Sequence, residues 1–252
     1  MTTLLNILRS TAVVLFGFGI VLFAPKAESP KNLKTIPKET NVISVIDFNS
    51  VANKGKLEDY SNLNFFKAFK LELKKDNEKI VRLIDDVMDN PISSGLNTAT
   101  DMFAYYINEA KDEKYVCISA EIKSEQKFTE FIEETLDKKE DDFDVEKTYN
   151  YTLVDNRMAI GWDTDKVVFL TADNIESCEN LDVEIETLFE LEEQDQITSK
   201  KEFNEFYNNK KDAKLYFSSN VTEVDEIKDI YSEEMVNVPK HYTLAYMNIG
   251  NR

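Results

Sequence analysis

A pattern of two strands followed by a helix occurs twice in this sequence and constrains the fold more than any other feature. The first copy covers residues 102–136, and the second covers residues 158–193, about 55 residues further on. In both copies, two apolar or alternating runs flank a polar turn and precede apolar residues spaced three and four apart. The repeat predicts an α+β fold, with a mainly antiparallel sheet and its helices on one face.

The segments around this repeat have the same mixed character. A β-branched run predicts a buried strand at residues 42–46, and helical spacing predicts one broken helix or two at residues 61–91. Ser124 is expected to cap the helix after the first hairpin. The inner face of that helix is predicted to contain Phe128, Phe131, Ile132 and Leu136. The other predicted elements are strands at 151–155, 213–219 and 241–249 and helices at 181–194, 200–210 and 222–235.

The N-terminal stretch between Arg9 and Lys26 contains 16 residues without charge. As a helix it would span about 24 Å, which is short for a bilayer core of about 30 Å and long for most signal peptides. A cleaved signal peptide and a retained N-terminal hydrophobic helix both remain open. The residues predicted to contact the membrane are Val13, Val14, Leu15, Phe16, Phe18, Ile20, Val21, Leu22 and Phe23.

The location of the rest of the chain depends on this stretch. Lys26, Lys31, Lys34 and Lys38 come after it, and a count of positive charges would keep the body in the cytoplasm. Short N-terminal signals with this layout nevertheless export the body of the protein, and we expect export. We divide the chain into a signal peptide or anchor at 1–25, an extended Lys/Pro-rich linker at 26–40, a first α+β domain at 41–197 and a partial second unit packed on it at 198–252.

The acidity of the chain argues against one large class of functions. The net charge is −18, and the only charged side chains before residue 27 are the basic Arg9 and Lys26. A body this acidic repels phosphate backbones, and no cluster of Lys and Arg interleaved with aromatics stands out. We therefore predict no nucleic-acid partner.

No motif in the sequence indicates a reaction or a cofactor. His241 is the only histidine, which argues against histidine-based metal clusters and catalytic triads. Asp141, Asp142, Asp144 and Glu146 form a candidate calcium site, but the stretch lacks the glycine and glutamate of the EF-hand pattern, which favours a solvated turn. Asp163 and Asp165 lie where a hairpin has to turn.

Two further groups of residues have both a structural and a functional interpretation. Aromatic residues on predicted strands favour core packing over an exposed binding strip for sugar or a partner. These residues are Tyr105, Tyr106, Tyr149, Tyr151 and Trp162. Cys117 and Cys178 lack metal-ligand spacing, and a disulfide between them remains open.

The order of several short motifs resembles exported cell-envelope proteins of Bacteroidota that contain a domain of unknown function. The matching segments are Ile36–Pro37, 42–50, Asn90–Pro91, Ser94–Leu96 and 203–216. The resemblance implies a location in the cell envelope and no known catalysis. Many such proteins are lipoproteins and longer, whereas this chain lacks the lipid-bearing cysteine and is short.

These observations favour a non-enzymatic envelope protein that binds the membrane through its N-terminal segment and binds an envelope partner through its α+β domain. Two alternatives stay open. A chain with 48 acidic residues could form a carboxylate-dependent glycan hydrolase, because the two carboxylates of such a site come from distant positions. The lysine count supports a membrane-tethered module that faces the cytoplasm.

Overall fold

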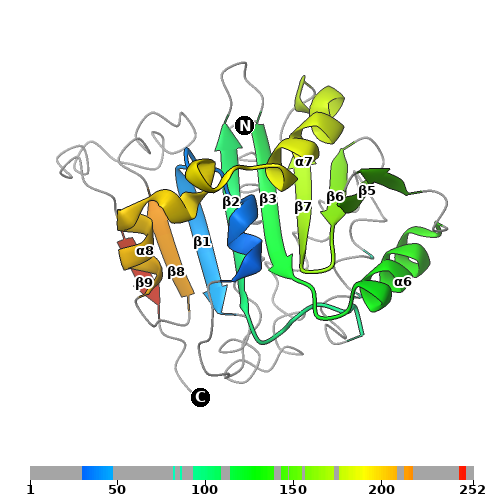
Figure 1. Cartoon of the computed structure of the whole chain (residues 1–252), viewed down its shortest axis with the longest axis horizontal. Helices are drawn as coiled ribbons and strands as arrows, with labels where there is room; N and C mark the ends of the chain where they lie inside the picture. Colours follow the sequence, from blue (N-terminus) through cyan, green and yellow to red (C-terminus); the bar gives the residue numbers. More distant parts are fainter. Residues whose placement is uncertain are drawn as a thin grey trace, which may run out of the picture.

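The computed structural model of the chain describes the greater part of one antiparallel sheet and the helices that cover it (Figure 1). The residues described are 30–47, 82, 86, 93–108, 114–138, 143–146, 148–154, 157–172, 176–208, 213–217 and 244–247. The strands are β1 (Val42–Asp47), β2 (Asp101–Asn108), β3 (Lys114–Glu121), β4 (Asp144–Glu146), β5 (Tyr149–Val154), β6 (Met158–Trp162), β7 (Lys166–Ala172), β8 (Ala213–Phe217) and β9 (Leu244–Met247).

All nine of these strands belong to one sheet, in the order β4-β5-β6-β7-β3-β2-β1-β8-β9. Each neighbouring pair is antiparallel, which confirms the predicted α+β class and the mainly antiparallel sheet. The two repeated hairpins, β2-β3 and β6-β7, lie side by side because β3 pairs with β7. Since β8 pairs with β1, the predicted second unit continues the sheet of the first.

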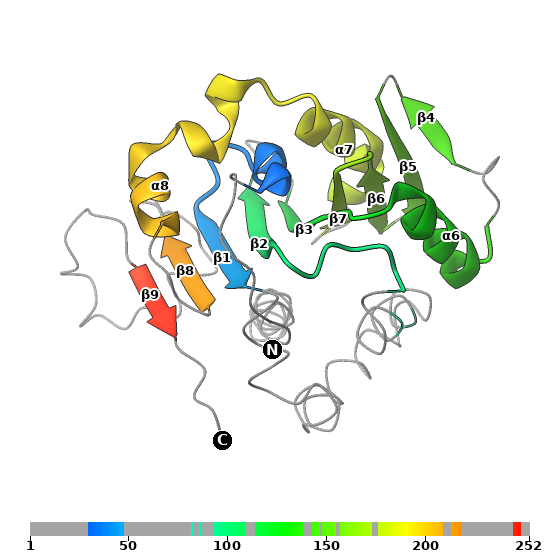
Figure 2. The ribbon, with the colours of Figure 1, turned by 60° about the horizontal axis from the view of Figure 1, so that its bottom comes forward.

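The helices cover both faces of the sheet, so the prediction that they lie on one face is wrong (Figure 2). A Cβ added to Gly161 of β6 would lie 2.7 Å from Ile185 in α7 (Leu181–Phe189). The next residue, Trp162, instead packs its ring 5.8 Å from Phe128 in α6 (Glu125–Leu136). Successive side chains of a strand point to opposite faces, so α7 and α6 lie on opposite sides.

The first face is the one covered by α7, α8 (Lys201–Tyr207) and the 3₁₀ helix η2 (Lys31–Thr35). Its core combines residues of these helices with the inward residues of six strands. Three short 3₁₀ helices lie beside the longer ones in the chain. The helix η4 (Glu176–Asn180) precedes α7, and η5 (Glu193–Asp195) and η6 (Ile197–Ser199) lie between α7 and α8. The largest fully buried side chains of this face are Tyr105, Tyr115, Tyr216, Phe103, Phe203 and Phe206.

The second face is the one covered by α6. Ser124 caps this helix as predicted, because its side chain accepts a hydrogen bond from the N–H of Lys127 at 3.4 Å. The predicted inner residues Phe128, Ile132 and Leu136 are buried, and Phe131 packs against the same cluster. Trp162 lies at the centre of this cluster, between Phe128 and Phe143.

Residues 31–40 do not form the extended linker that their lysines and prolines suggested. Leu33 and Ile36 are 1% and 0% exposed and belong to the core of the first face. Leu33 lies within η2, Ile36 directly follows it, and both side chains pack into the core of the first face. The Lys/Pro composition therefore conceals a short element of the domain itself.

Other predicted elements agree with the structure in part. The predicted helix at 181–194 ends at Phe189, and the one at 200–210 covers only α8. The predicted helices at 61–91 and 222–235 lie outside the described residues, except that Arg82 and Asp86 are helical. The predicted membrane segment at 1–25 also lies outside them. Within the described part of the chain, no helix has the length and apolar character needed to cross a membrane.

Candidate functional site: a polar network at the strand ends

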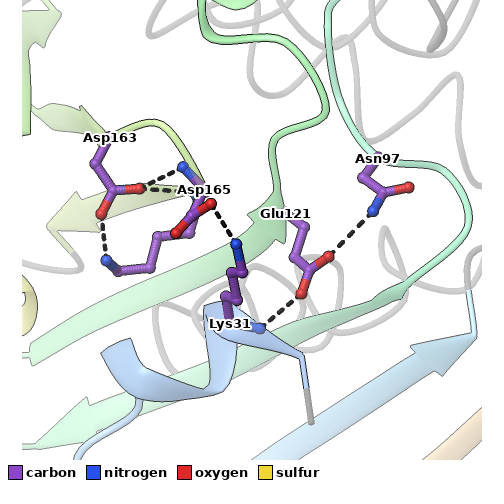
Figure 3. A network of polar contacts seen from close by, with 6 residues as sticks. Lys31, Asn97, Glu121, Asp163 and Asp165 are labelled. Carbon is purple, nitrogen blue, oxygen red and sulfur yellow. Dashed lines mark hydrogen bonds and ion pairs between the residues drawn. The ribbon is translucent and has the colours of Figure 1, made fainter. Parts of the chain in front are cut away.

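Acidic side chains meet at one edge of the sheet, where β1 and β3 end and β2 and β7 begin. Asp47 lies opposite Asp101, and Glu121 lies opposite Lys166. Phe103, two residues after Asp101, packs against Tyr207 of α8, and Ser119, two residues before Glu121, donates to the carbonyl of Asn32 in η2. Asp101 and Glu121 therefore face the same side of the sheet as these helices. We call this border the strand-end edge, and Figure 3 shows the network of polar contacts beside it.

Glu121 joins two segments that are distant in sequence (Figure 3). Its Oε1 accepts a hydrogen bond from the backbone N–H of Lys31 at 2.6 Å, and its Oε2 accepts one from Asn97 Nδ2 at 3.1 Å. The backbone N–H of Asn97 also donates to the carbonyl of Glu121 at 2.8 Å. Both carboxylate oxygens of Glu121 are thus used to hold the chain together.

The β6–β7 turn supplies the rest of the network (Figure 3). Asp163 Oδ1 accepts hydrogen bonds from the N–H groups of Asp165 and Lys166 at 2.7 and 2.8 Å, and its Oδ2 contacts Lys166 Nζ. Asp165 Oδ1 lies 2.5 Å from Lys31 Nζ. The prediction that these aspartates shape a hairpin turn is confirmed, because Asp163 makes the local bonds expected of a turn residue.

Asn32 carries the network into the core. Its buried Nδ2 donates to the carbonyls of Asp101 and Ser119 at 3.0 and 3.1 Å, bridging β2 and β3. Three residues later, the carbonyl of Thr35 accepts a hydrogen bond from the buried Tyr105 hydroxyl at 2.9 Å. These bonds satisfy buried polar groups that would otherwise cost free energy, so they fix where η2 lies on the sheet.

The Ser94–Leu96 turn lies beside the start of α6 and explains one motif of the resemblance. Gly95 has φ of +78°, and a Cβ there would lie 2.6 Å from the backbone N of Phe128. The carbonyl of Gly95 also accepts hydrogen bonds from the N–H groups of Lys123 and Ser124. Only glycine allows both the left-handed backbone and this close approach.

Tyr207 of α8 binds the acidic end of β2. Its hydroxyl donates to Asp101 Oδ2 at 2.7 Å. Burial, followed by the negative charge of Asp101, raises the pKa of Tyr207 well above its ordinary value. Tyr207 therefore stays protonated and acts as a hydrogen-bond donor that ties α8 to the strand-end edge.

A second cluster of polar side chains is buried beneath α7. Tyr105 and Cys117 lie opposite each other on β2 and β3, and Glu184 of α7 is buried near both. Burial and then the charge of Glu184 raise the pKa of the Cys117 thiol, and burial and then Cys117 raise the pKa of Tyr105. A raised pKa and full burial are the opposite of what a reactive thiol needs. Cys117 forms no disulfide, so it does not pair with Cys178.

An open depression of about 570 Å³ lies near η5 and η6. Glu192 and Glu193 line it together with Gln194, Thr198 and Ser199. Gln194 Nε2 donates to Glu192 Oε2 at 2.8 Å. The side chains of Glu192 and Glu193 are exposed, so this depression offers carboxylates to solvent.

The candidate calcium site is tested only in part. Asp141 and Asp142 lie outside the described residues, while Asp144 is exposed on the edge strand β4, which ends at Glu146. In the part of the chain that the structure describes, no three His, Cys, Asp or Glu side chains come together as metal ligands would. His241 also lies outside that part.

The five aromatic residues on the predicted strands do not form an exposed strip. Tyr105 and Trp162 are buried on opposite faces of the sheet, and Tyr149 is buried against Phe189 of α7 at a ring distance of 4.6 Å. Tyr106 and Tyr151 are half-buried. The core-packing interpretation is therefore correct for Tyr105, Tyr149 and Trp162.

Several residues of the network were not predicted from the sequence. Lys31 and Asn32 were assigned to the linker, and Asn97 and Glu121 to a loop and a strand end. The signal that could have identified the first pair is the spacing of Leu33 and Ile36 within an otherwise polar stretch. Glu121 and Asn97 give no such signal, because their partners are distant in sequence.

Chemically, the network consists of carboxylates that already accept hydrogen bonds or ion pairs from the protein. Glu121 and Asp163 each use both oxygens in this way. Such carboxylates are suited to fixing three segments, residues 31–35, 93–100 and the β6–β7 turn, in one arrangement.

Comparison with known proteins identifies the family. The family described as "Domain of unknown function (DUF4836)" matches residues 32–242 of this chain, so the chain belongs to it. This confirms the predicted likeness to a domain of unknown function. A comparison with curated proteins finds no match.

Among solved structures, crystal forms of TP0453 are similar to this chain. Form I has a TM-score of 0.38 and 11% identity, covering 75% of this chain and 63% of that one. Form III has a TM-score of 0.40 and 11% identity, covering 85% and 70%. Form IV has a TM-score of 0.41 and 12% identity, covering 79% and 68%. The match to form I thus spans less than two thirds of that chain.

Proposed function

We propose that this member of the DUF4836 family is a non-enzymatic protein of the bacterial cell envelope. Its N-terminal segment holds it at a membrane, and its α+β domain works by contact with another envelope component. The 16 uncharged residues after Arg9 support the membrane association. The order of the short motifs supports an exported location, because it resembles that of exported cell-envelope proteins.

The observation that carries the non-enzymatic role is the use of the strand-end carboxylates inside the protein. Catalytic carboxylates need an oxygen directed at a substrate. Glu121 and Asp163 instead bond to Lys31, Asn97 and the β6–β7 turn. The most elaborate polar arrangement of the described residues therefore serves the fold.

The location is tested by cell fractionation combined with N-terminal sequencing of the mature protein. We expect the protein in the membrane or envelope fraction. An intact chain found free in the soluble cytosolic fraction would contradict the proposal. The sequenced N-terminus also separates a cleaved signal from a retained anchor.

Orientation is tested by labelling with a membrane-impermeant maleimide. The reporter is Glu193→Cys in the exposed η5 turn, in a Cys178→Ser background, since Cys117 is buried. We expect equal labelling in spheroplasts and in lysed cells. Labelling only after lysis would instead support the cytoplasm-facing alternative that the lysine count favours. The Cys178→Ser chain without Glu193→Cys is the matched control.

The depression lined by Glu192 and Glu193, which we call the acid-lined depression, supports a second candidate function, that of a carboxylate-dependent glycan hydrolase. Glu192 and Glu193 are neighbours there and reach solvent. The test incubates the purified protein with envelope glycans and measures newly formed reducing ends. Under the contact role, no release above background is expected. Release that Glu192→Gln or Glu193→Gln abolishes would establish the hydrolase.

A further inference from the structure

The segment of residues 31–38 is attached to the first face along its whole length. At its start, Lys31 bonds to Glu121 and Asp165. In the middle, Asn32 and Thr35 bond to the sheet, and Leu33 and Ile36 enter the core. We call residues 31–38 the docked segment.

The far end of the docked segment is held by the connection between α7 and α8. The N–H of Lys38 donates to the carbonyl of Asp195 at 2.7 Å, and the N–H of Ile197 donates to the carbonyl of Ile36 at 2.8 Å. A bridge between Pro37 and Gln196 lies between these bonds. Fixed at both ends and buried between them, the docked segment belongs to the rigid part of the domain.

The connection between the docked segment and the uncharged N-terminal stretch, residues 10–25, is very short. We call that stretch the leader. Only residues 26–30 separate Pro25 from Lys31. Five extended residues span at most about 18 Å. A free linker over residues 26–40 would reach about 50 Å and would impose no orientation.

The direction of the docked segment decides which part of the domain the leader meets. The segment begins beside Glu121 and the β6–β7 turn, at the strand-end edge, and ends beside η5 (Figures 1 and 3). Strand β3 has eight residues, so the opposite edge of the sheet lies about 26 Å from the strand-end edge.

We propose that the strand-end edge around the β6–β7 turn is the membrane-facing surface of the domain and lies close to the lipid headgroups. This inference rests on the proposed membrane attachment and adds a defined orientation to it. The short connection holds this edge near the bilayer and directs η5 and the acid-lined depression away from it.

The charges of the edge restrict the kind of lipid that it can face. Lys31 pairs with Asp165, and Lys166 pairs with Asp163, so the β6–β7 turn itself takes part in two ion pairs. Asp47, Asp101 and Glu121 add negative charge at the same edge, so it would lie against neutral headgroups, because anionic headgroups would repel it. The exposed Glu192 and Glu193 would lie on the side away from the headgroups.

Energy transfer to labelled lipid tests the orientation. The full chain with Cys178→Ser is reconstituted into phosphatidylcholine vesicles in which some headgroups carry an acceptor dye. A donor dye is attached at Thr164→Cys in the β6–β7 turn or, as the matched control, at Glu193→Cys in η5. Both side chains are exposed, and neither belongs to the core.

We expect transfer from position 164 to exceed transfer from position 193 by about twofold or more, given distances of about 20 Å and 40 Å from the lipid. A flexible Gly-Ser insertion of about 15 residues between Glu28 and Ser29 should abolish the difference, because the connection then no longer restricts orientation. This insertion lies outside the docked segment, so we expect the contacts of residues 31–38 with the sheet to be kept.

Sedimentation with the vesicles separates the two ways in which the test can fail. A chain that sediments with vesicles but transfers equally from both positions overturns the orientation and leaves the membrane attachment standing. A chain that does not sediment with vesicles overturns both. A difference that persists after the insertion also overturns the inference, since the short connection would then not be its cause.

Discussion

The two faces of the sheet hold their helices by different physical means. On the second face, α6 packs through aromatic rings, with Phe128 and Phe143 meeting Trp162 at 5.8 and 5.1 Å. On the first face, apolar packing is combined with buried polar bonds, such as those of Asn32 and Tyr105. The second face gains stability mainly from buried area, whereas the first also fixes position and direction.

This difference matters because the first face places segments that are far apart in sequence. Asn32 bonds to residues 69 and 87 positions away. Apolar contacts tolerate small shifts between partners, but hydrogen bonds require defined distances and angles. The first face can therefore act as the part of the domain that sets orientation, while the second supplies bulk stability.

The largest expected effect tests the second face directly. Trp162→Ala removes the side chain around which Phe128 and Phe143 pack, and it also removes the hydrogen bond from Trp162 Nε1 to Thr129. We expect a loss of about 3–5 kcal/mol in the free energy of unfolding, measured by urea denaturation monitored by circular dichroism. Val145→Ala, at a side chain that is 74% exposed, is the control and should change stability by less than about 0.5 kcal/mol.

A somewhat smaller loss of stability is expected for substitutions of the two glycines that allow helices to pack closely, Gly95 beside α6 and Gly161 beside α7. Gly95→Ala must adopt a left-handed backbone and meets backbone atoms at 2.6 and 2.7 Å, so we expect a loss of about 2–4 kcal/mol. Gly161→Ala needs no left-handed backbone and meets side-chain atoms of α7 where Gly95→Ala meets backbone atoms, so its loss should be smaller. Thermal unfolding of both variants measures the difference, and an equal loss would contradict this explanation.

The polar network at the strand-end edge should contribute less to the free energy of unfolding than Trp162 or Gly95. Glu121→Ala removes the acceptor for Lys31 and Asn97, and we expect a loss of about 1–2 kcal/mol. The loss should be accompanied by faster hydrogen exchange at the N–H of Lys31 and of its neighbours in η2. Glu134→Ala on the exposed side of α6 is the control. Unchanged exchange in η2 would show that Glu121 does not hold the docked segment.

The sequence predicted the elements better than their arrangement. The hairpin at 102–122, the strand at 42–46 and the inner face of α6 can be derived from local periodicity, and the structure confirms them. The side that each helix covers cannot be derived from periodicity. Strand β6 is buried at every position, so its pattern contains no exposed face that would exclude one side.

The candidate site was least accessible to sequence reasoning. Asp163 was recognised as a turn residue because its bonds are local. Glu121 and Asn32 act through partners 24 to 90 residues away, and no spacing rule relates such positions. Lysine and proline content suggested a linker, whereas two apolar residues three positions apart, Leu33 and Ile36, attach this segment to the core.

Among the predicted changes in the free energy of unfolding at neutral pH, the smallest concerns Tyr207. This residue should also make the stability contributed by the first face depend on pH. Its folded pKa is raised, first by burial and then by Asp101, while in the unfolded chain a tyrosine has a pKa of about 10. Below pH 10 both states keep the proton, and the stabilisation is fully present. Above pH 10 the unfolded state releases the proton first, so stability falls as pH rises, by up to about 1.4 kcal/mol per pH unit for this group.

Tyr207→Phe should cost about 1 kcal/mol at neutral pH, because the bond to Asp101 is lost, and should reduce the decline above pH 10. Urea denaturation at pH 7, 9, 10 and 11 measures both effects. Phe131→Leu on the second face is the matched control, since it removes no titrating group and should leave the pH profile parallel to that of the wild type. If the Tyr207→Phe profile were also parallel, Tyr207 would not contribute to the loss of stability above pH 10.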